Sequence, residues 1–223
     1  MIGVLGGGQL GRMLALAAAP MNVAVAVLDP AENPPAAIAA RHVRGSFQDH
    51  STVLEFAKNV HVLTVEIEHV SVPALREVEM SGKHVFPGSA VLSTIQDKLR
   101  QLESLQTAGL PVPEFRDLPS DPGKRIGVLK EFKLPAVEKL RFGGYDGRGV
   151  IVLRDDADLG SPGLSGDAFV ERYVETEAEL SVIVARSRSG ETVAYPPFLM
   201  AMDPNYNLVD YVAYPAGVTA DVA

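Results

Sequence analysis

Cysteine is absent from this sequence of 223 residues, and long apolar runs are missing as well. Without cysteine the chain has no disulfide framework, no thiolate metal site and no cysteine nucleophile, a composition that fits a reducing cytoplasm. The apolar stretch Val23–Leu28 is far shorter than the roughly 18 to 20 residues that a membrane span needs. We therefore expect a cytoplasmic protein with no membrane partner.

The chain also lacks an excess of basic residues, because its formal net charge is −8 at pH 7. This balance argues against a general nucleic-acid or membrane-surface binder, since such proteins need a basic field that replaces counterions. A small anionic ligand can still be held by local cations and backbone N–H groups. No basic segment precedes the first apolar stretch, Met1–Leu5, so we interpret this N-terminus as structure and not as a signal peptide.

Apolar strands and helices alternate in the first part of the chain. Met1–Leu5 and Val23–Leu28 have the continuous apolar character of buried strands, and the Ala- and Leu-rich stretch Leu10–Ala19 between them is helical in pattern. The alternation continues with a helix at Ser51–Lys58, a strand at Val60–Val65, a helix at Val72–Met80 and a strand at His84–Phe86. The fold class predicted is α/β, with an N-terminal parallel, Rossmann-like domain over residues 1–88.

The pattern changes after a polar helix at Gln96–Ala108, which ends at Gly109. Strands then follow one another without crossover helices, and this order predicts a mainly antiparallel sheet. The predicted strands are Ala136–Leu140, Val150–Leu153, Ala168–Tyr173 and Leu180–Ala185, the last forming a hairpin with Thr192–Tyr195. We expect two further parts of the chain, over residues 89–174 and 175–223.

A glycine-rich loop, Gly6–Gly11, stands between the first predicted strand and the first predicted helix and contains a GxGxxG spacing. Glycines let backbone N–H groups approach a ligand closely, and a helix N-terminus attracts an anion. Asp29 ends the next strand, about where a dinucleotide-binding protein places its ribose-binding acid. A dinucleotide site, a site for a different phosphate and a purely structural turn all remain open, and we favour the second.

A second glycine-rich segment, Gly143–Gly149, joins two predicted strands, whereas a Walker loop opens a helix. Its glycines predict a flap whose N–H groups cover phosphates, while Lys139 on the incoming strand supplies a positive charge. The alternative is a flexible hairpin with a surface lysine. Tyr145, Asp146 and Arg148 stand between the glycines, and these residue types are unusual choices for flexibility alone.

Two carboxylates follow on later strands, at Glu171 and Glu179. Taken alone, each is expected to be solvated, because glutamate is rarely buried. In combination with Lys139 and the flap, they fit a nucleotide that is gripped between two sheets.

Five motifs share the order and spacing of the 5-(carboxyamino)imidazole ribonucleotide synthetase family, which the chain resembles over its whole length. They are Gly6–Met13, Glu66–Val70, Gln96–Lys98, Gly143–Gly149 and Glu179–Val182. The resemblance implies a pre-ATP-grasp domain over residues 1–88, an ATP-grasp linker and lid over residues 89–174, and an incomplete C-terminal ATP-grasp subdomain from residue 175. It implies ATP and Mg²⁺ as cofactors, aminoimidazole ribonucleotide and bicarbonate as further substrates, and a homodimer.

The resemblance also assigns roles to particular residues. Its catalytic set is Lys139, Tyr145 and Arg148. Its nucleotide-binding set is Lys98, Lys139, Gly144, Tyr145, Asp146, Gly147, Arg148, Gly149, Glu171, Arg172, Tyr173, Val174 and Glu179. Its substrate-binding set is Gly8, Gln9, Leu10, Glu66, Glu68, Tyr145 and Arg148, with Glu66 favoured over Glu68. The implied reaction is attack of bicarbonate on ATP to give carboxyphosphate, followed by transfer of the carboxyl group to the amine of the ribonucleotide.

Three features depart from the family, and one of them is Leu199, which stands in a proline-rich strand where relatives often place a glutamate. The family's magnesium ligands have no counterpart up to Ala223, so we assign no metal ligand in this sequence and expect no catalysis by it alone. Glu138 stands where an apolar residue is expected, and strand alternation points it away from the Lys139 side, into packing where an unpaired carboxylate is costly.

Two other classes of protein stay open. A different ATP-grasp ligase, such as a biotin carboxylase or a formate-using purine enzyme, would share Lys139 and Glu179. A non-catalytic nucleotide-binding protein or an NAD-dependent protein would share only the front loop.

Overall fold

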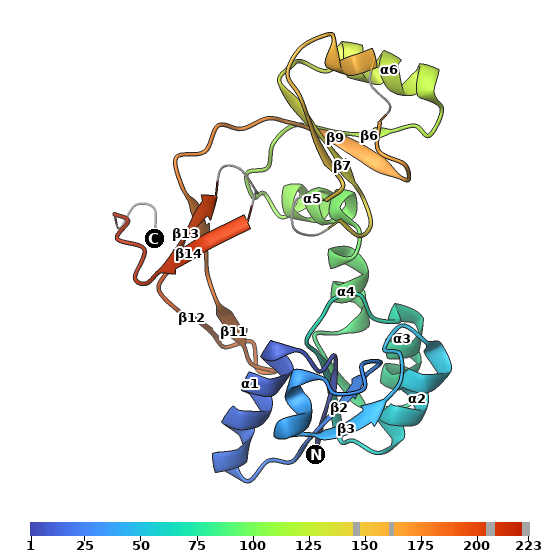
Figure 1. The fold of residues 1–223 in the computed structure, drawn as a ribbon, viewed down its shortest axis with the longest axis vertical. Helices are drawn as coiled ribbons and strands as arrows, with labels where there is room; N and C mark the ends of the chain where they lie inside the picture. The colour runs from blue at the N-terminus through green and yellow to red at the C-terminus, as the bar shows by residue number, and fades with distance from the viewer. Residues whose placement is uncertain (145–147, 161–162, 204–207, 220–223) are drawn as a thin grey trace. The chain divides into compact units, whose positions relative to one another are not determined.

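The computed structural model of this protein describes residues 1–144, 148–160, 163–203 and 208–219. The chain divides into two compact units (Figure 1). The first unit comprises Met1–Val112 together with Arg141–Gly143, and the second comprises Pro113–Leu140 together with Gly144–Ala223. None of the helices in the described residues has the length and apolar character that crossing a membrane requires.

The first unit is built on a five-stranded parallel sheet with the strand order β3-β2-β1-β4-β5. The strands are β1 (Ile2–Leu5), β2 (Val25–Asp29), β3 (Arg41–Arg44), β4 (Val62–Val65) and β5 (His84–Phe86). The chain moves outward from β1 to β3 and then returns to the other side of β1 with β4. In open parallel sheets ligands bind at such a reversal, beyond the carboxyl ends of the two strands. The predicted parallel α/β domain is confirmed.

Helices cover both faces of this sheet. They are α1 (Gln9–Ala18), α2 (His50–Lys58), α3 (Val72–Met80) and α4 (Ser89–Ile95), with short 3-10 turns η1 (Ala19–Met21) and η2 (Pro35–Ile38), and α5 (Lys98–Thr107) follows α4 in the chain. Val4 packs in a cluster with residues of α1 and η2, whereas the next residue, Leu5, packs in a cluster with residues of α2 and α3. Because neighbouring strand residues point to opposite faces, an apolar residue at every position of β1 fills both clusters.

The second unit begins with a four-stranded antiparallel sheet of order β6-β9-β7-β8. Its strands are β6 (Phe115–Leu118), β7 (Ala136–Leu140), β8 (Val150–Leu153) and β9 (Ala168–Arg172), accompanied by α6 (Pro122–Glu131) and η3 (Asp158–Gly160). Ala136 and Val170 pack with Leu129 of α6 on one face of the sheet. The expected antiparallel sheet is confirmed, while β6 and α6 were not predicted.

The remaining strands form a three-stranded sheet of order β10-β13-β14 and a separate hairpin of β11 and β12. They are β10 (Glu179–Ser181), β11 (Val184–Arg186), β12 (Thr192–Ala194), β13 (Phe198–Asp203) and β14 (Leu208–Ala213). The single strand predicted at Leu180–Ala185 was wrong, because the chain changes its pairing partner from β13 to β12 within it. The hairpin itself is confirmed.

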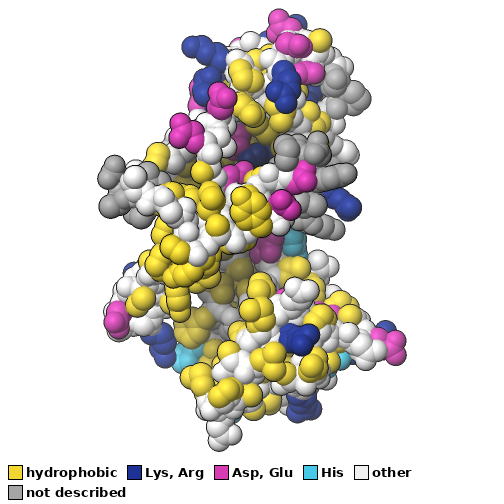
Figure 2. All heavy atoms as spheres, turned by 60° about the vertical axis from the view of Figure 1, so that its left-hand side comes forward, with side chains coloured by type: hydrophobic (Ala, Val, Ile, Leu, Met, Phe, Trp, Pro, Cys, Tyr) yellow, Lys and Arg dark blue, Asp and Glu magenta, His cyan; other side chains and the backbone are white. Residues whose placement is uncertain are grey.

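Large apolar side chains on β11–β14 remain exposed, among them Val184, Val193, Tyr211 and Val212. Figure 2 turns the side that carries these strands toward the viewer, and hydrophobic side chains gather there. Soluble domains rarely leave an apolar patch of this kind exposed to solvent.

Glu138 on β7 is fully buried, and its carboxylate has charged and neutral partners. Arg125 of α6 donates to both carboxylate oxygens, with a Nε–Oε1 distance of 3.3 Å, and the N–H of Leu164 donates to Oε1 at 3.0 Å. Gly163 makes room for this arrangement, because a Cβ at that position would collide with the guanidinium of Arg125. The unexpected glutamate is therefore an internal tie between β7, α6 and the segment that precedes β9.

Replacing Arg125 with Met should lower the free energy of unfolding by about 3–5 kcal/mol, because it leaves a buried carboxylate without its cation. The matched control is Lys58→Met, which removes an exposed pair with Glu55 and should cost less than about 1 kcal/mol. Urea unfolding followed by circular dichroism measures both variants. Equal costs for the two variants would contradict the assigned role, whereas the double variant R125M/E138M should recover much of the lost stability.

Candidate functional site

The front glycine loop lies at the carboxyl end of β1, and its N–H groups are held by two carboxylates. The N–H of Gly7 donates to Asp29 Oδ2 at 2.8 Å, and the N–H of Gly8 donates to Glu66 Oε2 at 2.9 Å. Glu66 follows β4, so the strand reversal of the sheet brings it to the start of α1, where Leu10 N–H donates to its Oε1 at 3.3 Å. A Cβ at Gly8 would come too close to Glu66 Oε1, so a larger residue at this position would displace the carboxylate from the N–H groups that it accepts.

The Asp29 carboxylate stabilises the conformation of this loop. Besides the bond from Gly7, its Oδ1 accepts the N–H of Ala31 at 2.8 Å. A ribose hydroxyl would have to compete with these backbone donors. The geometry thus favours a structural role for Asp29 over the ribose contact that a dinucleotide site would require.

The two glutamates of the Glu66–Val70 motif have different surroundings. Glu66 is half-buried at the helix start, beside Gly8, Gln9 and Leu10, whereas Glu68 is exposed. The Glu68 carboxylate lies 3.5 Å from Nδ1 of His69, and its main-chain carbonyl accepts Nε2 of Gln96 at 2.6 Å. Of these two glutamates, Glu66 is the one whose carboxylate lies at the glycine loop.

At the start of α5, Asp97 and Lys98 meet the segment that leads into the second glycine loop. Arg141 donates to Asp97 through Nε at 3.1 Å and Nη2 at 2.6 Å. The Lys98 ammonium donates to the carbonyl of Gly143. Burial by itself raises the pKa of the Asp97 carboxyl, but the bonds from Arg141 and from the backbone of Arg100 and Leu99 outweigh it and hold that pKa below its ordinary value.

Lys139 on β7 and Glu171 on β9 form an ion pair, with Nζ 2.5 Å from Oε1. Val137 lies opposite Glu171 in the sheet. Lys139, two residues after Val137, is therefore the diagonal neighbour of Glu171 on the same face. Glu138 points to the other face, toward α6, as strand alternation predicted. The Lys139 side chain keeps 32% of its surface exposed and that of Glu171 keeps 12%, so the pair is partly desolvated.

Of the other expected nucleotide-binding residues, Arg172–Val174 lie at the end of β9, whereas Glu179 lies on a strand of a different sheet. The guanidinium of Arg172 donates to Glu114 and lies over the ring of Phe132. Tyr173 and Val174, which follow β9, are exposed. Glu179 is exposed at the start of β10.

The second glycine loop is described at its two ends. Gly144 and Gly149 have φ values of 68° and 74°, a backbone conformation that favours glycine, and Arg148 is exposed. A Cβ at Gly144 would approach the carbonyl of Arg148 too closely. Tyr145, Asp146 and Gly147 lie outside the described residues.

No group of three or more His, Cys, Asp or Glu side chains that could hold a metal ion occurs within residues 1–144, 148–160, 163–203 and 208–219. The carboxylates of Glu171, Asp97 and Glu66 are instead paired with Lys139, Arg141 and backbone N–H groups, respectively. This part of the chain does not offer Mg²⁺ a ligand set of the kind that the ion prefers.

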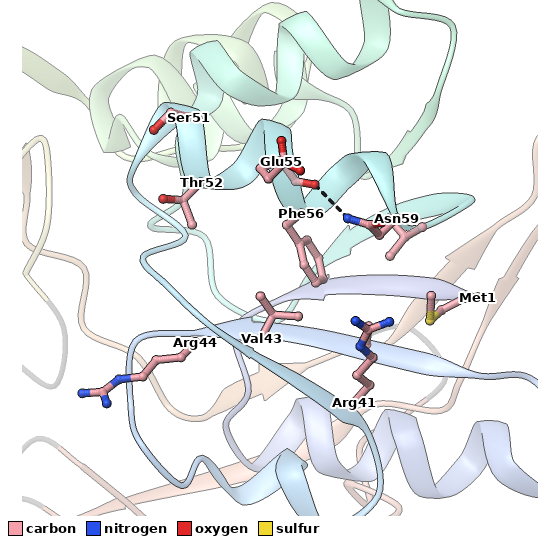
Figure 3. Close-up of a pocket in the computed structure, with 11 residues that line it drawn as sticks. Met1, Arg41, Val43, Arg44, Ser51, Thr52, Glu55, Phe56 and Asn59 are labelled. Carbon is pink, nitrogen blue, oxygen red and sulfur yellow. Dashed lines mark hydrogen bonds between the residues drawn. The ribbon is translucent and has the colours of Figure 1, made fainter.

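A cavity of about 500 Å³ lies between α2 and strands β2 and β3, apart from all of these residues. In Figure 3 Phe56 of α2 and Asn59, which directly follows that helix, face Arg41 and Val43 of β3 across it. None of the residues that line the cavity belongs to the expected site.

A parallel sheet with a glycine loop at its reversal, followed by an antiparallel sheet with a lysine, a glutamate and a second glycine loop, is an arrangement found in a class of two-part nucleotide-binding proteins. Residues 1–96 match the family model of the ribonucleotide synthetase preATP-grasp domain, and residues 103–223 match that of the ATP-grasp domain. The chain therefore belongs to the ATP-grasp family.

Similar proteins support the resemblance seen in the sequence. The chain is 40% identical to phosphoribosylaminoimidazole carboxylase of Vigna aconitifolia and 38% identical to N5-carboxyaminoimidazole ribonucleotide synthase of Pseudomonas aeruginosa, in each case over 87% of this chain. It covers 36% and 54% of those proteins, respectively. It thus spans about half of the bacterial relative and less of the plant one.

Solved structures of such synthetases have the same fold. A complex with ADP is 34% identical, with a TM-score of 0.89 over 99% of this chain and 59% of that one. The Aspergillus clavatus enzyme in complex with ADP and 5-aminoimidazole ribonucleotide is 32% identical, with a TM-score of 0.88 over 99% of this chain and 58% of that one. The resemblance to this group of ATP-grasp proteins is confirmed.

Replacing Glu66 with Ala should destabilise the first unit by about 1–2 kcal/mol, because the start of α1 loses the acceptor for two N–H groups. Glu68→Ala is the matched control in the same motif and should change stability by less than about 0.5 kcal/mol. Urea unfolding of both variants measures the difference. A cost at Glu68 as large as that at Glu66 would refute the assignment of the helix start to Glu66.

Proposed function

We propose that this chain forms the nucleotide- and ribonucleotide-binding part of an ATP- and bicarbonate-dependent carboxylase. The proposed reaction converts 5-aminoimidazole ribonucleotide to 5-(carboxyamino)imidazole ribonucleotide in de novo purine biosynthesis. The observation that carries the proposal is the partly desolvated Lys139–Glu171 pair on the antiparallel sheet of an ATP-grasp chain. The relative bound to ADP and 5-aminoimidazole ribonucleotide supports this choice of ligands.

In the proposed nucleotide site, Lys98 and Lys139 each face ATP phosphates, and the N–H groups of Gly144 and Gly149 help to cover them. Glu171 and the segment Arg172–Val174 meet the adenine, and Glu179 accepts the ribose hydroxyls. The chemistry requires little more of the protein than position and charge, since stabilising the developing charge on phosphoryl oxygens supplies much of the catalysis in phosphoryl transfer.

The proposed reaction has two steps. A bicarbonate oxygen attacks the γ-phosphorus of ATP, the bond to the β-phosphate oxygen breaks, and ADP leaves carboxyphosphate behind. The amine nitrogen of the ribonucleotide then attacks the carboxyl carbon, inorganic phosphate leaves, and the nitrogen loses a proton. Lys139 and Arg148, with Tyr145, are the proposed catalytic residues for these steps.

The proposed ribonucleotide site lies at the carboxyl ends of β1 and β4. Glu66 accepts two N–H bonds there, yet a carboxylate has about four lone-pair positions and can accept further bonds from an amine or a hydroxyl. Gly8, Gln9 and Leu10 shape this site. Glu68, Tyr145 and Arg148 complete the proposed set.

The proposal further includes Mg²⁺ accompanying ATP, a homodimer and a cytoplasmic location. The described residues contain no group of three or more side chains that could hold the ion, so no step of the reaction is assigned to it. The second candidate function is a different ATP-grasp ligase, because the family match to residues 103–223 would be shared by such an enzyme.

Lys139→Met should weaken ADP and ATP binding about tenfold or more, because a hydrogen bond to a charged group contributes roughly 1.5–3 kcal/mol. The exposed Lys58→Met variant is the control and should bind both nucleotides like the wild-type chain. Isothermal titration calorimetry measures the affinities, and circular dichroism checks that the fold is kept. Unchanged nucleotide affinity in the Lys139 variant would remove this lysine from the site.

A protein of these 223 residues should release no phosphate from ATP in a manner that depends on bicarbonate and aminoimidazole ribonucleotide. The described residues offer no carboxylate cluster for the metal that neutralises transferring phosphoryl oxygens, and losing that neutralisation raises the barrier by several kcal/mol. A chimera that adds the remaining part of the Pseudomonas aeruginosa relative should gain the activity. Substrate-dependent phosphate release by the 223 residues, abolished by Lys139→Met, would contradict the expectation.

A further inference from the structure

Asp97 is a nearly completely buried carboxylate to which the proposed reaction gives no role. Only 3% of its surface is exposed, and it precedes the first residue of α5. Its oxygens accept both the Nε and Nη2 donors of Arg141 and, in addition, the N–H groups of Leu99 and Arg100 at 3.2 and 3.3 Å. A two-point bond between guanidinium and carboxylate fixes orientation as well as distance.

This ion pair joins residues that stand 44 positions apart in the sequence. Arg141–Gly143 directly follows β7, a strand of the second unit, yet these three residues pack as part of the first unit. Lys98 reinforces the attachment, because its N–H donates to the carbonyl of Arg141 at 2.9 Å and its ammonium donates to the carbonyl of Gly143. The segment is thereby held through one side chain and two carbonyl groups.

The Lys98 ammonium thus depends on the backbone that Asp97 fixes. A lysine side chain loses rotamer freedom when it is held in one position, and a pre-set carbonyl partner removes part of that cost from ligand binding. The carbonyl of Gly143 is such a partner. Its position is restrained because the guanidinium of Arg141, two residues earlier, is bonded to the Asp97 carboxylate.

We propose that Asp97 is a positioning residue for phosphate recognition, acting through Arg141 and the Gly143 carbonyl to set the place of the Lys98 ammonium. The proposal rests on the proposed function, since it takes Lys98 to bind nucleotide phosphates. The ligand class that it concerns is nucleoside di- and triphosphates, in contrast to nucleosides, which lack the phosphates that Lys98 would contact.

The experiment compares ADP with adenosine by isothermal titration calorimetry on the 223-residue chain. Asp97→Asn keeps a good helix-capping residue but removes the charge that pairs with Arg141. We expect ADP affinity to fall about tenfold and adenosine affinity to stay unchanged, because only the phosphate contact is disturbed. Asp49→Asn is the matched control, since Asp49 caps α2 in the same way without an arginine partner, and it should leave both affinities unchanged.

A double-variant cycle tests whether Asp97 acts through Lys98. Lys98→Met should reproduce the loss for ADP, and D97N/K98M should bind ADP no more weakly than K98M alone, because coupled residues are not additive. Arg141→Lys keeps the positive charge but loses the two-point geometry, so it should give the same loss selective for ADP even if Asp97→Asn folds poorly.

Two results would overturn the proposal while leaving the proposed function intact. One is an equal loss of ADP and adenosine affinity in the Asp97 and Arg141 variants, which would mean that the pair only stabilises the fold. The other is additivity of the Asp97 and Lys98 effects. A wild-type chain that binds adenosine but gains nothing from the phosphates of ADP would instead refute the proposed function, and the positioning role with it.

Discussion

Pairing of buried carboxylates is the constraint on which both units of this chain depend. A desolvated carboxylate is tolerated only when cations or N–H groups surround it. The buried Glu138 pairs with Arg125, the buried Asp97 pairs with Arg141, and the half-buried Glu171 pairs with Lys139. Among the buried side-chain nitrogen and oxygen atoms of the described residues, none lacks a hydrogen-bond partner.

The same constraint organises the candidate site. The reversal of strand order at β1 and β4 brings Glu66 to the start of α1, where it accepts N–H groups that the helix itself cannot satisfy. In the second unit, alternation along β7 sends Glu138 into the core and Lys139 to the opposite face. A structural carboxylate thus stabilises the strand from behind the lysine that we propose to bind phosphate.

Much of the fold could be predicted from the sequence, because continuous apolar runs such as Met1–Leu5 mark buried parallel strands and the absence of crossover helices marks an antiparallel sheet. Edge strand β3, Arg41–Arg44, escaped prediction because half of it is charged. The split within residues 180–185 depends on which strands pair, and local pattern does not contain that information. Local pattern also does not reveal the partners of Glu138 and Asp97. These partners lie 13 and 44 residues away in the sequence, and they come into contact with the carboxylates only when the sheet and helices have formed.

The proposed function requires that this chain binds an adenine nucleotide through its ATP-grasp part and a ribonucleotide through its front loop. Calorimetric titration of ADP, NAD and 5-aminoimidazole ribonucleotide, singly and in pairs, tests it most directly. The account predicts that ADP and 5-aminoimidazole ribonucleotide bind together without competing and that NAD does not bind. Binding of NAD that excludes 5-aminoimidazole ribonucleotide and is lost in Asp29→Ala would contradict it, because the front loop would then be a dinucleotide site.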